Sequence, residues 1–144
     1  MGFLTGKTAI ITGAGRAVLK DGSCGSIGYG IATAYAKEGA NLVITGRNVK
    51  KLESAKQELE SLYGIKVLTV QADVCAGGDN EATVANVIKQ AVDTFGGIQV
   101  LINNAQASAS GVPLAEHTTE QFDLAIYSGL YAAFYYMKAC YPYL

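Results

Sequence analysis

A regular alternation between short apolar runs and longer amphipathic segments is the feature that most constrains how this chain can fold. The short runs are rich in β-branched residues and predict buried strands. The first and the last are almost continuously apolar, which is typical of parallel strands covered on both faces. The predicted strands are 8–12, 41–45, 66–71 and 99–103.

Amphipathic segments between these strands predict helices with recognisable ends. Residues 27–38 form the first helix, and Gly39 follows it as a stop signal. Asn48 can cap the second helix, and Asp79 or Asn80 can cap the third. In the first helix, the apolar positions at helical spacing are Ile27, Ile31, Ala34 and Tyr35.

The last predicted helix opens at Thr118. Thr118 and Gln121 have capping-box spacing, in which each side chain satisfies an otherwise unpaired backbone N–H. Pro142 marks the end of this helix. Its expected core stripe consists of Phe122, Ala125, Ile126, Gly129, Ala133, Phe134 and Met137.

Strands and helices therefore alternate as β-α-β-α-β-α-β-α. This order predicts an α/β fold, a Rossmann-like doubly wound parallel sheet with right-handed crossovers. The 144 residues suit a single domain, 1–144, and half of them are hydrophobic, which is enough for a packed core.

Charge and cysteine usage exclude several classes of protein. The net charge is −1 and basic residues are scattered, so neither a nucleic-acid partner nor an anionic membrane is expected. Cys24, Cys75 and Cys140 lie far apart, without CxxC spacing or a histidine cluster, which predicts no metal site and a reducing, cytoplasmic setting. No apolar run approaches the roughly 20 residues of a membrane span.

A glycine-rich turn after the first strand is the most informative stretch for function. Residues 12–16 read TGAGR, and residues 26–32 read SIGYGIA. Glycines at a strand-to-helix turn let the backbone approach a pyrophosphate closely, and the helix N-terminus offers free N–H groups to the phosphates. An ordinary tight turn is the alternative, but the position between a predicted strand and helix favours phosphate binding.

These residues resemble the TGxxxGIG element of the short-chain dehydrogenase/reductase family. Residues 17–26 (AVLKDGSCGS) stand where most members have one residue, so that Gly25 or Ser26 takes the place of the middle glycine. The spacing is also similar to that of the branch that includes enoyl-thioester reductases. The resemblance implies contacts to a dinucleotide cofactor from Gly13, Ser26, Ile27 and Gly28.

Two further elements carry the same resemblance. Asp73 and Val74 look like the family's DV pair, in which the Asp side chain and neighbouring backbone hold the adenine; a turn cap is the alternative role for Asp73. Residues 103–106 (NNAQ) resemble the family's NNAG, which supports the central sheet and borders the cofactor, here through Asn104 and Ala105. The last residue of this element is Gln instead of Gly.

The end of the second predicted strand indicates which cofactor is bound. An acidic residue there would bond the ribose 2′-hydroxyl of NAD(H), whereas an arginine accommodates the 2′-phosphate of NADP(H). This sequence offers Arg47 and no carboxylate, and Arg16 can add a second positive charge. NADP(H) is therefore favoured over NAD(H), although a solvated loop residue is the alternative role for Arg47.

The resemblance covers only the first part of the family's fold. The family's proton donor is a Tyr within YxxxK, helped by a Ser on the preceding strand, and none of the nine tyrosines here has Lys four positions later. Many relatives also carry an Asn in the long helix, and Gly129 stands at that position. No catalytic residue is assigned, and domain 1–144 is expected to be a Rossmann domain truncated before the catalytic region.

Tyr127, Tyr131 and Tyr135 recur at every fourth residue beside the expected core stripe. Tyrosines are enriched at interfaces because their bodies are apolar and their tips polar. Relatives usually form oligomers through long helices in this region, so the resemblance implies a homo-oligomer. The alternative is that these tyrosines cover the remaining part of the same subunit.

The sequence thus predicts an oxidoreductase that transfers hydride between NADP(H) and a small-molecule carbonyl or alcohol substrate, with enoyl reduction as a minor option. A non-catalytic dinucleotide-binding module or regulatory subunit is the competing hypothesis. The absence of YxxxK favours that second hypothesis.

Overall fold

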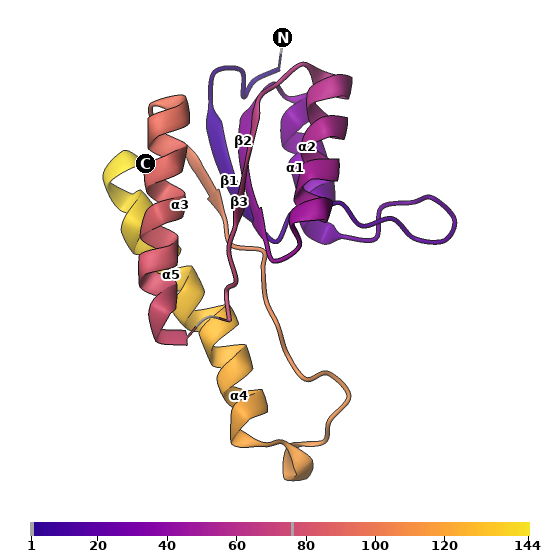
Figure 1. The fold of residues 1–144 in the computed structure, drawn as a ribbon, viewed down its shortest axis with the longest axis vertical. Coiled ribbons are helices and arrows are strands. Elements are labelled where there is room, and N and C mark those ends of the chain that lie inside the picture. The colour runs from indigo at the N-terminus through magenta and orange to yellow at the C-terminus, as the bar shows by residue number, and fades with distance from the viewer. Residues whose placement is uncertain (1, 76) are drawn as a thin grey trace.

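The computed structural model describes residues 2–75 and 77–144, and its centre is a parallel sheet with helices on both faces (Figure 1). The strand order is β3-β2-β1-β4, so β1 lies inside the sheet between β2 and β4. The strands are β1 (Thr8–Thr12), β2 (Asn41–Gly46), β3 (Val67–Gln71) and β4 (Val100–Ile102). The predicted Rossmann-like fold is confirmed, with strand ends shifted by at most one residue.

The helices cover the two faces of the sheet in pairs (Figure 1). One face packs against α1 (Ile27–Lys37) and α2 (Val49–Tyr63), and the other against α3 (Asn80–Phe95) and α5 (Ala132–Cys140). A long C-terminal helix is built from α4 (Thr119–Ile126), a π-helical turn (Tyr127–Tyr131) and α5. Single 3-10 turns occur at Gly77–Asp79, Leu114–Glu116 and Tyr141–Tyr143.

Alternation along β1 divides the core into two clusters. Ala9 and Ile11 face α1 and α2, whereas Ile10 faces α3 and α5. Successive side chains of a strand point to opposite faces, so a strand buried on both faces must be apolar throughout. All five residues of the TAIIT run are buried, which explains why its centre, Ala9 to Ile11, is apolar without interruption.

The predicted helix ends are largely confirmed. The Asn48 Oδ1 atom accepts a bond of 3.0 Å from the N–H of Lys51, and Thr118 forms the expected capping box with Gln121. Asp79 precedes α3, but its side chain makes no capping hydrogen bond. Its backbone is already helical, so the carboxylate is not positioned as a cap.

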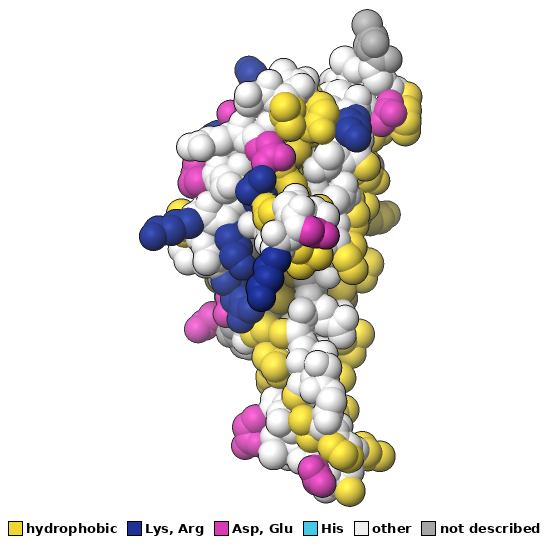
Figure 2. All heavy atoms as spheres, turned by 90° about the vertical axis from the view of Figure 1, so that its right-hand side faces the viewer, with side chains coloured by type: hydrophobic (Ala, Val, Ile, Leu, Met, Phe, Trp, Pro, Cys, Tyr) yellow, Lys and Arg dark blue, Asp and Glu magenta, His cyan; other side chains and the backbone are white. Residues whose placement is uncertain are grey.

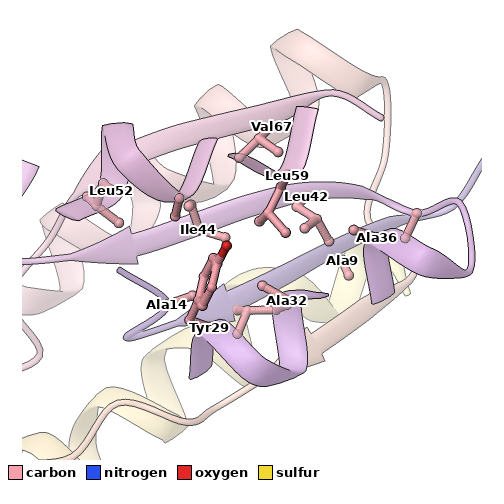
Figure 3. Packing of buried hydrophobic residues seen from close by; sticks show 13 residues of the cluster. Ala9, Ala14, Tyr29, Ala32, Ala36, Leu42, Ile44, Leu52, Leu59 and Val67 are labelled. Carbon is pink, nitrogen blue, oxygen red and sulfur yellow. The ribbon is translucent and has the colours of Figure 1, made fainter. Parts of the chain in front are cut away.

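The prediction of which side of α1 faces the sheet is wrong, because the buried side is rotated about the helix axis from the predicted one. Ile27 is 79% exposed, and the buried residues are Gly28, Tyr29, Ala32 and Ala36. Figure 3 shows Tyr29 lying among Ala14, Ile44 and Ala32. Small residues let α1 approach the sheet, and the single large ring fills the space beside them. Ile31 and Tyr35 only border this cluster.

The expected core stripe of the last helix is also wrong. Phe122, Phe134 and Met137 are more than half exposed. The face that meets the sheet carries Ser128, Ala132, Tyr136 and Cys140 instead. This helix is apolar on more than one side, so periodicity alone could not select the buried face, and the π-helical turn shifts the phase along the helix.

Within residues 2–75 and 77–144, each helix is either too short or too polar to span a lipid bilayer. No group of three or more potential His, Cys, Asp or Glu ligands could hold a metal ion in that part of the chain.

Candidate functional site

The carboxyl ends of all the strands open onto one cavity of about 410 Å³. In an open α/β sheet, ligands bind in the crevice outside the carboxyl ends of the strands, where the strand order reverses. Here that reversal lies at β1, because β2 and β4 pair with its two sides. The cavity is lined by Gly13, 25–28, 46–47, Ala72, 74–75 and 104–107.

A close approach between backbone segments forms the floor of this cavity. Gly13 has φ of 69°, a conformation that L side chains rarely adopt. A Cβ atom added at Gly28 would overlap the carbonyl oxygen of Gly13 and lie 2.6 Å from Asn104 Nδ2. The first turn of α1 can therefore lie against the end of β1 only because residue 28 has no side chain.

Asn104 fixes the end of β4 to the end of β1. Its Nδ2 atom donates to the carbonyl oxygens of Thr12 and Gly13 at 3.0 and 3.2 Å. In return, Thr12 Oγ1 accepts from the N–H groups of Asn104 and Ala105, both at 3.0 Å. Sequence reasoning missed Thr12, although a polar residue ending an otherwise apolar buried strand is a usable signal.

The N-terminus of α1 faces the same cavity. Ser26 is the N-cap, and its Oγ atom accepts from the N–H of Tyr29 at 3.4 Å. The first N–H groups of a helix, here those of Ile27 and Gly28, have no acceptor within the helix. Together with the helix dipole they favour an anionic group at this position.

The additional residues 17–25 form a small hairpin that projects from the body of the protein beside this helix end (Figure 1). Val18 and Cys24 form an isolated antiparallel bridge, and the N–H of Gly25 donates to the carbonyl of Ala17 at 2.9 Å. Gly25 belongs to the closed hairpin, and Ser26 is the N-cap of α1. Both residues nevertheless line the cavity.

Arg47 is the single charged side chain among the described residues that line this cavity. It lies just after β2 and is exposed. Figure 2 shows Lys and Arg side chains gathered at mid-height of the face that carries α1, α2 and the hairpin. A positive local field of this kind attracts anionic ligands.

Arg16 does not deliver the second positive charge that the sequence suggested. Its guanidinium forms an ion pair with Glu58 of α2, and the backbone N–H of Arg16 donates to the carbonyl of Lys51 at 2.9 Å. It is not among the residues lining the cavity. Burial, and then the neighbouring Glu58, raise the pKa of Tyr29 on the inner side of this ion pair to about 12.

The DV pair divides between two neighbouring cavities. Val74 lines the large one, whereas Asp73 and Arg47 line an adjoining cavity of about 340 Å³. Asp73 Oδ1 accepts from the N–H of Cys75 at 2.9 Å, so one carboxylate oxygen caps a turn. Burial raises the pKa of the Cys75 thiol, and the Asp73 carboxylate adds to this effect.

Ser128 anchors the loop that follows β4. Its Oγ atom accepts from the N–H of Ala107 and donates to the carbonyl of the same residue, both at 2.9 Å. Ser128 is buried, and the sequence signal that could have revealed it is a lone polar residue within an apolar helix. A smaller cavity of about 100 Å³ lies behind this loop, against Gly129 and Tyr136.

The arrangement fits an extended anionic ligand with two arms. Its phosphates would lie on the N-terminus of α1, one arm would extend toward Arg47 and Val74, and the other toward Asn104 and Ala105. Eight of the ten predicted contact residues line the central cavity, Asp73 adjoins it, and Arg16 lies outside it.

Sequence comparison agrees with this geometry. The family described as short chain dehydrogenase matches residues 7–144. The chain is 60% identical to a 12alpha-hydroxysteroid dehydrogenase from a Clostridium species, over all of this chain and 53% of that protein.

Solved structures match the fold as well. L-sorbose reductase from Gluconobacter frateurii, complexed with NADPH and L-sorbose, has a TM-score of 0.83 and 30% identity, over 99% of this chain and 48% of that one. An alcohol dehydrogenase from the archaeon Thermococcus sibiricus, complexed with 5-hydroxy-NADP, has a TM-score of 0.82 and 30% identity, over 96% and 53%.

The chain spans about half the length of these proteins. The family's sequence pattern extends over almost all of the 144 residues, and the fold and the backbone geometry at Gly28 agree with it. The chain belongs to the short-chain dehydrogenase family.

Proposed function

We propose that the protein of which this chain forms at least a part is an NADP(H)-dependent oxidoreductase acting on an alcohol or carbonyl group. The observation that carries the proposal is that one cavity holds both a helix N-terminus and an arginine, with no carboxylate among the lining residues that the structure describes. The relatives solved with NADPH and 5-hydroxy-NADP support the choice of cofactor.

Each residue of the cavity has a distinct task in this proposal. The N–H groups of Ile27 and Gly28 bind the pyrophosphate, and Arg47 binds the 2′-phosphate. Val74 packs against the adenine, and Asn104 keeps the end of β4 in place beside the other nucleoside. The bound cofactor supplies or accepts the hydride at its nicotinamide ring.

The proton that accompanies the hydride needs a donor that the motifs of these 144 residues do not offer. We place that donor in the part of the family's length that this chain does not span. A non-catalytic nucleotide-binding module remains the second candidate function, because no tyrosine here is followed by Lys four positions later.

A hydroxysteroid is the proposed substrate class, and the support for it is the name of the relative with 60% identity. Oxidation would transfer hydride from the carbinol carbon to the oxidised nicotinamide. The hydroxyl proton would pass to the same group that donates a proton during reduction. The proposed compartment is the cytoplasm, which the free thiols of Cys24, Cys75 and Cys140 support.

The tyrosine seam of the long helix, exposed at Tyr127 and Tyr131 and partly buried at Tyr135, is the proposed contact between subunits. The rings of Tyr127 and Tyr131 lie 5.5 Å apart between centroids, and those of Tyr131 and Tyr135 lie 6.0 Å apart. Tyr131 is 44% exposed, and Leu130 and Phe134 beside it are more exposed still. Exposed aromatic and apolar side chains grouped in this way are typical of an interface.

Replacing Gly28 by Ala should abolish cofactor binding. The new Cβ atom would meet backbone rather than a flexible side chain, so α1 must move away from the end of β1. The matched control is Gly30→Ala, because Gly30 lies in the same helix with open space around its Cβ position. The control should bind normally and gain up to about 1 kcal/mol in stability. Calorimetric titration with NADP⁺ and thermal unfolding check both; equal behaviour of the two variants would contradict the model of the site.

Arg47→Glu should weaken NADP⁺ binding about 10- to 100-fold, the range expected for losing a hydrogen bond to a charged group. NAD⁺ lacks the 2′-phosphate, so its affinity should change far less. Lys50→Glu is the control, since Lys50 also carries an exposed positive charge but does not line the cavity. Equal losses for NADP⁺ and NAD⁺ would show that Arg47 does not contact the 2′-phosphate.

The full-length protein should reduce NADP⁺ when supplied with a 12α-hydroxysteroid. Ultraviolet absorbance of the reduced nicotinamide follows the reaction, and steroids hydroxylated at other positions test its regiochemistry. Binding of NADP⁺ without turnover on any alcohol or ketone of the panel would favour the non-catalytic module instead.

Tyr131→Glu should reduce the mass of the oligomer in light scattering, because it places a charge within the seam. Leu62→Glu is the control, since Leu62 is an exposed apolar residue on α2, outside the seam. An unchanged mass combined with a lower melting temperature would mean that the seam packs inside its own subunit.

A further inference from the structure

Two of the positions at which the chain departs from the family's pattern, Gln106 and Gly129, lie close together in the structure. A Cβ atom at Gly129 would lie 3.6 Å from Gln106 Nε2 and 3.8 Å from Gln106 Cδ. The carboxamide of Gln106 therefore lies beside the part of the long helix that carries no side chain, and a Cβ atom at residue 129 would just touch it. A side chain extending beyond Cβ toward Gln106 would compete with the carboxamide for the same space.

Two features hold the loop and the helix in this relation. The hydrogen bonds between Ser128 and Ala107 fix the residue that follows Gln106 to the residue that precedes Gly129. The helix makes a π-helical turn at this point, where the N–H of Ala132 donates to the carbonyl of Tyr127. π-helical turns are rare and often occur at functional sites.

The position of Gln106 identifies which arm of the ligand it meets. Gln106 lines both the large cavity and the smaller one behind it. Because the strand order is β3-β2-β1-β4, the end of β4 and the end of β2 lie on opposite sides of β1. If the phosphates lie at β1 and the adenosine arm extends toward Arg47, Gln106 faces the nicotinamide arm.

We propose that the Gln106 carboxamide binds and orients the nicotinamide nucleoside of the cofactor, and that Gly129 provides the space in which it does so. A carboxamide both donates and accepts hydrogen bonds, which suits ribose hydroxyls and the amide of nicotinamide. Gln106 is exposed on the cavity side, so it can make these bonds. The inference rests on the proposed function, since it requires a nicotinamide cofactor.

The test compares two ligands that differ by the nicotinamide arm. Full-length protein is titrated calorimetrically with NADP⁺ and with adenosine 2′,5′-bisphosphate, which has the 2′-phosphate but no nicotinamide. Gln106→Ala should weaken NADP⁺ about tenfold, as expected for one or two lost hydrogen bonds, and should change affinity for the bisphosphate less than about twofold. Gln57→Ala, an exposed glutamine of α2 outside the cavity, should change neither.

A second variant tests whether the absence of a side chain at residue 129 matters for the position of Gln106. Gly129→Leu keeps Gln106 but displaces its carboxamide, so it should reproduce the selective loss of NADP⁺ affinity. Equal weakening of both ligands by Gln106→Ala would show a general effect on the cleft and overturn the inference, as would no weakening of either. If the unaltered protein bound neither ligand, the proposed function itself would fail.

Discussion

At Gly28 the first turn of α1 lies so close to the carbonyl oxygen of Gly13 that no Cβ atom can be accommodated. This contact places the helix N-terminus over the end of β1, and the anion-binding geometry follows from it. Asn104 extends the arrangement, since its carboxamide donates to Thr12 and Gly13 and so brings the end of β4 to the same point. The positions of both arms of the cleft therefore depend on one backbone contact, that between Gly28 and Gly13.

Charge selects among the ligands that such a cleft can hold. Arg47 lines the cavity and directly follows β2, whereas Arg16 lies outside the cavity and pairs with Glu58 of α2. Both are exposed or partly exposed arginines near the same helix end, yet their neighbours give them different tasks. An ion pair within the protein neutralises one, whereas no carboxylate occurs among the described residues that line the cavity, which leaves the charge of the other for the ligand.

The sequence predicted the parts of the fold that depend on local pattern. Continuous apolar runs identified the four strands, and the motifs at the strand ends identified eight of the fourteen described residues that line the cleft. It could not predict which side of an apolar helix faces the sheet, as the exposure of Phe134 and burial of Tyr136 show. Nor could it place Arg16, or show that Gln106 meets Gly129, because those contacts join segments that are distant in the chain.

The hairpin of residues 17–25 leaves and rejoins the body of the protein at neighbouring points and is closed by its own backbone bonds, such as that from Leu19 to the carbonyl of Ser23. The entropy lost on closing a flexible loop grows only with the logarithm of its length, about 0.6 kcal/mol for each doubling. Insertions and deletions at its tip are thus nearly neutral for folding. The length and sequence of this hairpin can therefore vary in evolution without moving the N-terminus of α1, where the phosphates are proposed to bind.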